Sequence, residues 1–308
     1  MSARATDVVF FGQEGAGSFN ESGLAGARAA QAKGHAVNIH WIADPQTRND
    51  ALARIAESRP ELVIAHGGQG NLPVRSVAAD FPETRFVVTQ GEYLAPNVAS
   101  YEVLQEQSAF LAGVLAARLS RSQVVGHLSG EKVPPGLKGR AAFHAGYEAA
   151  GGQRFVTAFC GDQHDPELGY RYGRSLIEAG ADVIFAMLDG GRPGLIQACR
   201  EAGIKQIGNV LDWTAREGAV FAASAMADSG QLIDIAIGDH AAGNLRLNHK
   251  VCFGLERPDL VRLQLHAELQ AALGPELETW RERILAHPQQ VRTAYAGPEL
   301  QSHPLPAV

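Results

Sequence analysis

Short apolar runs alternate with longer segments of helical periodicity along most of the chain. Residues 8–11 form the first run, and residues 124–128 open a second series of the same kind. Runs of this length suit buried strands. Strands that alternate with helices predict a parallel sheet with helices on both faces. We therefore expect an α/β fold with two doubly wound lobes. The other expected strands are residues 35–42, 62–65, 85–89, 154–159, 182–187, 206–210 and 220–225.

The pattern restarts near Gln123 and becomes irregular after Leu245. We predict an N-terminal lobe and C-terminal crossing made of residues 1–121 and 246–308, and a second lobe made of residues 122–245. The tail after Pro288 lacks periodicity and is either a final crossing or a loosely packed end. The expected helices after the first one are residues 47–58, 107–119, 140–150, 168–179, 194–201, 258–273 and 277–285.

A glycine-rich loop at residues 12–17 separates the first strand from the first helix. Ser18 followed by Glu21 is the capping-box pattern of a helix start. A helix N-terminus presents unpaired N–H groups and a partial positive charge, so the loop either holds a polar ligand or is an ordinary turn. The spacing of its glycines does not match GxGxxG, so a dinucleotide-binding fold is not supported.

Polar and glycine residues follow several predicted strands. Ligands of open α/β sheets bind beyond the carboxyl ends of the strands, so these segments are candidate pocket walls. In the first lobe they are residues 13–20, 66–69 and 90–93. In the second lobe, Asp189 and Asp212 stand at strand ends.

The strand-end aspartates have three interpretations: they bind a ligand, cap the next helix, or act in acid–base catalysis. Trp213 directly follows Asp212 and is either a stacking surface for a planar ligand or a core or lid residue. Phe19 suits the core, and Asn20 is the better polar candidate beside it.

The composition limits the partners. A net charge of −6 and a pI near 6.0 argue against a nucleic-acid or anionic-membrane surface. No apolar run reaches the roughly 20 residues that cross a bilayer. No secretory signal or lipobox cysteine precedes the first strand, so we expect a cytosolic protein or a mature form without its leader. We expect each of the three cysteines to be a small buried residue.

No catalytic constellation emerges from the sequence. GxSxG, HExxH and P-loop patterns are absent, and the eleven histidines do not have metal-ligand spacing. His66 and His144 suit hydrogen-bonded structural roles. We therefore predict a protein that is not an enzyme, with no cofactor and no metal.

Several motifs in a fixed order resemble the basic membrane protein family (Bmp or PnrA-like, also Med-like) of ABC-transporter substrate-binding proteins. The resemblance spans roughly residues 8–228 and rests mainly on the FLAG and GADVIF blocks. The matching residues are Ser18, Phe19 and Asn20, then Pro96, Asn97 and Val98, the block 108–113, Phe143 and Gly146, Asp165, Pro166 and Gly169, the block 180–185, Ile207, Gly208 and Asp212.

The resemblance implies a periplasmic-binding-protein-like fold, with two lobes that close by a hinge on a ligand in the interlobe cleft. It implies binding of purine nucleosides and delivery to an ABC permease and its ATPase, in the periplasm or at the membrane. We expect a monomer that binds no nucleic acid. The alternative is a cytosolic ligand-sensing protein of the same fold.

The chain departs from the family at acidic positions and at a lysine. Glu14 is the nearest acid before the SFN motif, since residues 15–17 are Gly, Ala and Gly. Gln90 replaces an aspartate, Ala227 lies near the position of the lysine, and Asp212 stands alone where the family has paired aspartates. Because acids and a lysine suit ribose hydroxyls, we expect a free purine base or another planar heterocycle. The predicted ligand-binding residues are Gln13, Glu14, Phe19, Asn20, Gly68, Gln69, Gln90, Tyr93, Asp189, Gly190, Asp212 and Trp213.

Overall fold

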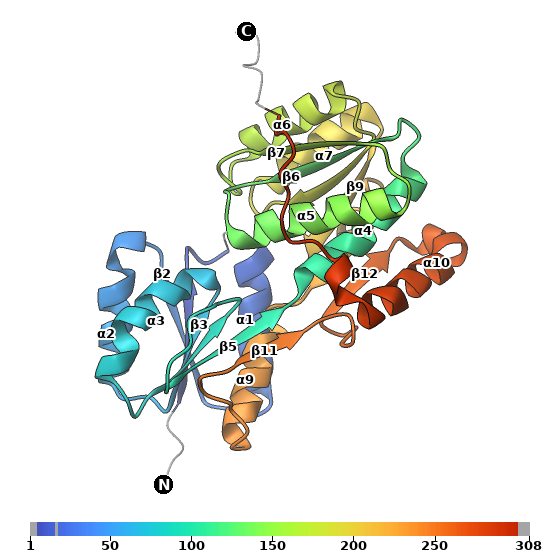
Figure 1. Cartoon of the computed structure of the whole chain (residues 1–308). Helices are drawn as coiled ribbons and strands as arrows, with labels where there is room; N and C mark the ends of the chain where they lie inside the picture. Colours follow the sequence, from blue (N-terminus) through green and yellow to red (C-terminus); the bar gives the residue numbers. More distant parts are fainter. Residues whose placement is uncertain (1–4, 16–17, 301–308) are drawn as a thin grey trace. The chain divides into compact units, whose positions relative to one another are not determined.

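The computed structural model describes residues 5–15 and 18–300 and divides into two compact units (Figure 1). Unit 1 comprises the chain up to Val103 together with Asp228–Phe253, and unit 2 comprises Leu104–Ala227 and the chain from Gly254 onward. The chain therefore passes between the units at three points. Each unit contains one six-stranded, mostly parallel sheet with helices packed against it.

Unit 1 has the strand order β11-β5-β4-β3-β1-β2, with all neighbours parallel. Its strands are β1 (Thr6–Phe11), β2 (Val37–Ile42), β3 (Leu62–His66), β4 (Arg85–Thr89), β5 (Val98–Val103) and β11 (Lys250–Phe253). Its helices are α1 (Ser18–Ala32), α2 (Arg48–Glu57), α3 (Asn71–Val77) and α9 (Gln231–Ala241), with short 3₁₀ turns at Pro45–Thr47, Gly68–Gly70 and Ala78–Asp80.

Unit 2 has the order β12-β10-β9-β8-β6-β7, in which only the β10–β12 pair is antiparallel among the described strands. Its strands are β6 (Val124–Ser129), β7 (Arg154–Phe159), β8 (Val183–Met187), β9 (Lys205–Val210), β10 (Phe221–Ala227) and β12 (Val261–Leu265). Its helices are α4 (Gln105–Leu119), α5 (Pro134–Ala149), α6 (Pro166–Glu178), α7 (Arg192–Ala202), α8 (Trp213–Arg216) and α10 (Ala267–Ala286), followed by a 3₁₀ turn at Pro288–Gln290.

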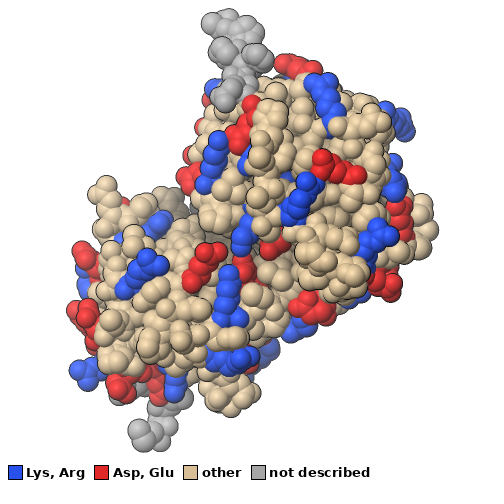
Figure 2. Space-filling view, viewed as in Figure 1, with Lys and Arg blue, Asp and Glu red and all other residues tan. Residues whose placement is uncertain are grey.

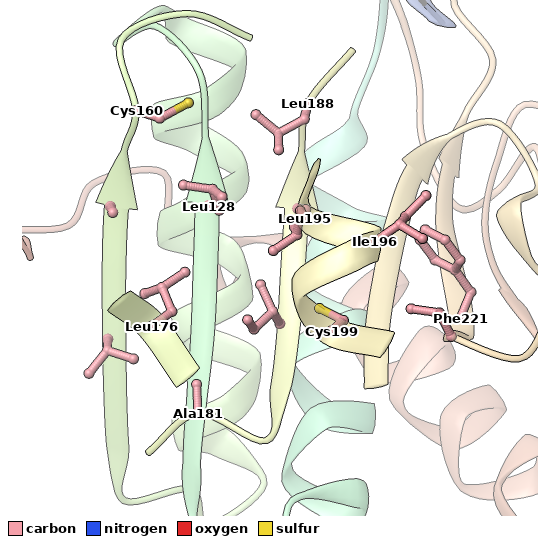
Figure 3. Packing of buried hydrophobic residues seen from close by; sticks show 14 of the residues in the cluster. Leu128, Cys160, Leu176, Ala181, Leu188, Leu195, Ile196, Cys199 and Phe221 are labelled. Atoms are coloured by element: carbon pink, nitrogen blue, oxygen red, sulfur yellow. The ribbon is translucent and has the colours of Figure 1, made fainter. Parts of the chain in front are cut away.

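The sheets form because their central strands are apolar on both faces. Val8, Val9 and Phe10 of β1 are fully buried, as continuous burial in a parallel sheet requires. In unit 2, apolar side chains of β6 and β8 meet those of α6 and α7, and Figure 3 shows Leu195 and Cys199 in this cluster. The predicted α/β class with two doubly wound sheets is confirmed.

The helices α4 and α5 cross at a pair of glycines. A Cβ on Gly113 would lie 2.0 Å from the carbonyl oxygen of Phe143, and a Cβ on Gly146 would lie 2.0 Å from that of Phe110. Only hydrogen at both positions allows the backbones to approach this closely. The crossing gives a physical reason for the glycine of the FLAG block.

The division into units differs from the predicted one. Helix α4 and the chain from Gly254 pack with unit 2, whereas residues 228–253 complete the sheet and helices of unit 1. The strongly apolar α4 lies on unit 2 because it crosses α5 at the glycine pair and contacts β10 and β12. The contacts of α4 with α5, β10 and β12 determine that it belongs to unit 2, and its position in the sequence does not show these contacts.

The predicted helix at residues 258–273 is wrong. Val261–Leu265 is a strand antiparallel to β10, and one helix, α10, runs through Pro275. The sequence VRLQL alternates apolar and polar residues as a strand does, and Val261 and Leu265 are buried. The prediction left a break at residues 274–276 between two helices, but α10 continues through Pro275.

Other expectations have mixed outcomes. Cys160 and Cys199 are buried as predicted, but Cys252 is exposed because it lies on the edge strand β11. Helix α1 begins at Ser18 as predicted, whereas the side chain of Ser18, and Ala16 and Gly17 of the first loop, lie outside the described residues.

The tail after α10 packs on unit 2 and crosses α5 (Figure 1). The Glu299 carboxylate lies 2.5 Å from the guanidinium of the buried Arg140 and 2.7 Å from Lys132. The N–H of Leu300 donates to the Thr157 carbonyl at the β7 edge. The described part of the tail is therefore an ordered, ion-paired segment, unlike the loosely packed end that was one of two predictions.

Candidate functional site

The three predicted strand-end loops of unit 1 begin at neighbouring strands. β1, β3 and β4 are adjacent in the sheet, and Phe10 of β1 pairs with His66 of β3. Because parallel strands end at the same edge, residues 13–20, 66–69 and 90–93 start side by side there. Gln13, Glu14, Gly68 and Gln69 are exposed, so their polar groups are accessible.

The buried His66 side chain connects these loops through hydrogen bonds. Its Nδ1 lies 2.9 Å from the Thr89 hydroxyl, and its Nε2 lies 3.3 Å from the Phe19 carbonyl. Since a carbonyl only accepts, Nε2 carries the proton, and the Thr89 hydroxyl donates to Nδ1 while accepting from the Gly67 N–H. Burial lowers the pKa of His66 to about 4, so the ring is neutral. The predicted structural role of His66 is confirmed.

Phe19 stacks on the His66 ring with 4.4 Å between centroids. It is half-buried, which agrees with its expected place in the core and leaves part of the ring accessible. Asn20 is also half-buried, and a Cβ on Gly12 would lie 3.1 Å from its amide nitrogen. Asn20 therefore lies directly behind the start of the first loop.

Asn71 joins two of the loops, and sequence reasoning missed it. Its amide nitrogen donates to the Gly68 carbonyl, while its oxygen accepts from the N–H groups of Glu92 and Tyr93 at 2.8 and 3.0 Å. Tyr93 is further held by Arg75, whose guanidinium carbon lies 5.1 Å from its ring centre. The available signal was an asparagine just after a glycine-rich strand end.

Gln90 is already engaged with its own unit. Its amide oxygen accepts from the Val103 N–H at 2.6 Å, and its amide nitrogen donates to the Val103 carbonyl at 3.3 Å. Its backbone has φ +53°, a left-handed conformation that is rare for residues other than glycine. The side chain thus holds a strained strand end against β5, and its ligand contact remains a prediction.

In unit 2, the candidate residues follow the adjacent strands β8 and β9. Asp189 and Gly190 are half-buried, and Gly190 packs against His164. Asp212 caps α8: its Oδ1 accepts from the Thr214 and Ala215 N–H groups at 3.0 and 3.4 Å. The capping interpretation of Asp212 is confirmed, and a ligand contact through Oδ2 remains a prediction.

Trp213 is held by protein groups over its ring. The indole N–H donates to the Asn209 carbonyl at 3.1 Å, and the ring stacks on Phe221 at 5.6 Å between centroids. The guanidinium carbons of Arg192 and Arg216 lie 4.5 and 5.4 Å from the ring centre. These contacts match the core alternative for Trp213, and its stacking on a ligand stays a prediction.

Arg192 is a second residue that sequence reasoning missed. It is fully buried, and its guanidinium donates to the Leu188 carbonyl at 2.5 Å and to the Asn209 side-chain oxygen. Burial lowers its pKa to about 10, so it remains charged at neutral pH. The sequence feature that could have revealed Arg192 is its position at the start of a helix. Arg192 is the first residue of α7, where the helix dipole disfavours a cation.

A separate hollow lies in unit 2, away from these strand ends. It has a volume of about 290 Å³ and lies between α4, β12 and α10, with Leu111, Leu263 and Leu277 among its lining residues. The predicted site residues do not line it. We therefore place the candidate site at the strand ends.

Comparison with known proteins identifies the family. The model of the Bmp family, described as ABC transporter substrate-binding protein PnrA-like, matches residues 7–291. The chain belongs to this family. A purine-binding protein of Brucella abortus is 24% identical over 172 residues, which are 56% of this chain and 49% of that protein. The chain spans about half the length of the curated relatives that it matches first.

Solved structures agree on the fold. A solute-binding protein of an ABC transporter system from Aeropyrum pernix has a TM-score of 0.77 at 22% identity, covering 93% of this chain and 86% of that one. A transcriptional activator of the comK gene from Bacillus halodurans has a TM-score of 0.77 at 16% identity, covering 92% and 99%. These likenesses show the periplasmic-binding-protein-like fold of this Bmp-family chain.

The described residues contain no candidate metal site and no membrane-spanning helix. No group of three His, Cys, Asp or Glu side chains there could hold a metal ion. In the same residues, every helix is too short or too polar to cross a membrane. Lys and Arg mix with Asp and Glu over the face shown in Figure 2, without a large basic patch.

Proposed function

We propose that the protein is the substrate-binding component of an ABC importer and captures a purine base or a related planar heterocycle. The observation that carries the proposal is membership of a substrate-binding family, with exposed polar groups gathered at the strand ends of unit 1. The purine class is supported by the Brucella abortus relative, which is named a purine-binding protein.

The strand-end chemistry suits a base better than a sugar. Gln13, Asn20 and Gln69 carry amides, each of which both donates and accepts, as the edges of a purine do. The Asp212 carboxylate accepts hydrogen bonds and suits a ring N–H or an exocyclic amine. We propose that the strand-end residues bind the ligand and break none of its bonds.

Delivery to a permease and its ATPase is part of the proposal, since the family is one of transporter substrate-binding proteins. A ligand-sensing role is the alternative, because the transcriptional activator protein med of Bacillus subtilis is 25% identical over 180 residues and the activator of Bacillus halodurans shares the fold. Co-purification with a permease from native membranes supports import, whereas a change in transcription on ligand addition, with no permease bound, supports sensing.

The test is native mass spectrometry of the freshly purified protein, followed by denaturation and identification of what is released. We expect a purine or similar heterocycle with one ligand per chain. Calorimetry with adenine, guanine, hypoxanthine and the matching nucleosides then ranks the class. Binding of a nucleoside more tightly than of its base contradicts the base assignment, and no binding of any purine contradicts the ligand class.

A further inference from the structure

The guanidinium of Arg192 connects the carboxyl ends of two neighbouring strands. It donates to the carbonyls of Ala186, at 3.4 Å, and Leu188, at 2.5 Å, where β8 ends. It also donates to the side-chain oxygen of Asn209 on β9. The same group lies 4.5 Å from the centre of the Trp213 ring, within the range of a cation–π contact. One buried cation therefore joins β8, β9 and the start of α8.

The strand end held in this way is strained. Val210 has φ +65°, a conformation that a β-branched residue rarely adopts, and the Leu211 N–H closes a γ-turn on the Asn209 carbonyl at 2.8 Å. The turn leads directly to Asp212 and Trp213. Such a conformation persists only where surrounding groups enforce it, and it is common at ligand-binding sites. Arg192 and the Trp213 indole hold Asn209 from both its side chain and its carbonyl.

Stability alone does not account for an arginine at this place. Burial of the Arg192 cation costs desolvation that an apolar residue of similar size avoids, and the charge of Asp189 offsets only part of this cost, since the pKa of Arg192 is still lowered. Arg192 also sits at the positive end of α7. Its Nε finds no hydrogen-bond partner within the described part of the chain, so one donor is buried without compensation. An apolar residue fills the same volume but cannot bind carbonyls on two strands.

We propose that Arg192 is a positioning residue of the ligand site, which locks the turn at Asn209, Val210 and Leu211 to β8 and so fixes the direction in which Asp212 is presented. The inference rests on the proposed function, because Asp212 is expected to bind the ligand. Arg192 itself is buried beneath the strand ends and acts through Asn209 and Trp213.

The test is the variant R192K, which replaces the planar guanidinium and its several N–H donors with a single ammonium group. It is made in a W41F/W280F background, so that Trp213 is the only tryptophan. The matched control is R140K, which changes another buried arginine between two aromatic rings, Phe159 and Tyr295, beside β7. The measurements are Trp213 emission, amide exchange of residues 209–216 and calorimetry with the purine that the parent protein binds most tightly.

We expect R192K to shift Trp213 emission to the red, to speed amide exchange at residues 209–213 by about tenfold and to weaken binding by about tenfold, since a charged hydrogen bond to Asn209 is lost. We expect R140K to change exchange and affinity by less than about twofold, because a positioning effect acts only on the site that it supports. Unchanged exchange and emission in R192K, or the same changes in R140K, overturn the proposal.

If R192K fails to fold, N209A carries the test, because it removes only the β9 partner and leaves the carbonyl bonds of Arg192 in place. We expect the same faster exchange and weaker binding, and parent-like values overturn the proposal. Failure of the proposed function is a different result: the parent binds no purine, while exchange and emission still report whether Arg192 holds the turn. If the parent binds a purine and R192K binds it with the same affinity, the positioning role of Arg192 is overturned, whereas the proposed function is not.

Discussion

The strands β4 and β9 occupy the same place in their two sheets, third from the end that begins with β11 or β12. Each strand end carries a residue with a positive φ that is not glycine: Gln90, directly after β4, at +53° and Val210, the last residue of β9, at +65°. In unit 1 the Gln90 side chain holds its own strand end by bonds to Val103. In unit 2 the Val210 side chain has no polar group, and Arg192 from the preceding helix, α7, holds the strand end by its hydrogen bond to Asn209.

The comparison shows two solutions to one structural problem. Unit 1 stabilises its strand ends with neutral groups, namely a neutral His66, the Asn71 amide and the Gln90 amide. Unit 2 uses a buried cation that remains charged at neutral pH. The two supports should therefore respond differently to acid, to loss of charge and to relief of backbone strain.

Acid gives the largest expected effect. Burial lowers the pKa of His66 to about 4 and that of His127 to about 3, below the ordinary value of 6.5. The unfolded chain thus binds more protons than the folded one below pH 6.5, and stability falls as the pH drops from 6.5 toward 4. We expect a loss of roughly 5 kcal/mol at pH 4.5 from the two groups together.

Urea unfolding between pH 7 and 4.5 measures this loss, and the double variant H66Q/H127Q is the control that lacks both titrating groups. Amide exchange at pH 5 sharpens the comparison. Residues 67–70 above His66 should exchange faster, whereas residues 209–213 should keep their protection because Arg192 does not titrate in acid. Equal acceleration of the two loops would show that they share one support.

A second buried arginine in unit 2 tests the role of a carboxylate partner. Arg140 pairs with Glu299, whose pKa is lowered by hydrogen bonds from Lys132 and Arg140. We expect E299A to lower the free energy of unfolding by about 3 kcal/mol, because it leaves a buried cation unpaired. Chemical denaturation measures the change, with the exposed E268A as control. A loss equal to that of E268A would mean that the tail does not stabilise unit 2.

Two substitutions of Asp212 distinguish its role as a helix cap from its proposed role in ligand binding. D212N keeps an oxygen that can cap α8 but removes the charge, so we expect nearly parent stability and binding of the purine about tenfold weaker. D212A should show the same loss of affinity and an additional loss of stability of about 1 kcal/mol from the missing cap. Calorimetry and thermal unfolding distinguish the two. Parent-like affinity of D212N removes Asp212 from the site.

Relief of strain gives the smallest effect. Glycine tolerates a positive φ, so Q90G and V210G both relax the backbone. Q90G also loses two hydrogen bonds to Val103, and we expect it to destabilise the protein by about 1–2 kcal/mol. In V210G the relief offsets the lost apolar burial, so we expect a change below about 1 kcal/mol. Equal effects in the two variants would contradict the difference between the strand ends.

Much of the fold was predictable because a strand that is buried on both faces has a continuous run of apolar residues in its sequence. The central strands of both sheets are continuous apolar runs, and the polar residues that end them mark the loops at the sheet edge. The edge strands β11 and β12 were missed, because partial exposure leaves them short and mixed in composition. The prediction also divided helix α10 at residues 274–276, where the structure shows one continuous helix.

By itself, then, the sequence determined the α/β class, the strand-end positions and the likeness to the Bmp family, since these depend on local periodicity and on motifs in order. Only the tertiary structure decided that α4 belongs to unit 2, that Asn71 joins two loops and that Arg192 supports the β9 turn. Each of these depends on contacts between residues far apart in the chain or on different elements. No local pattern encodes a contact whose partner lies on another strand or helix.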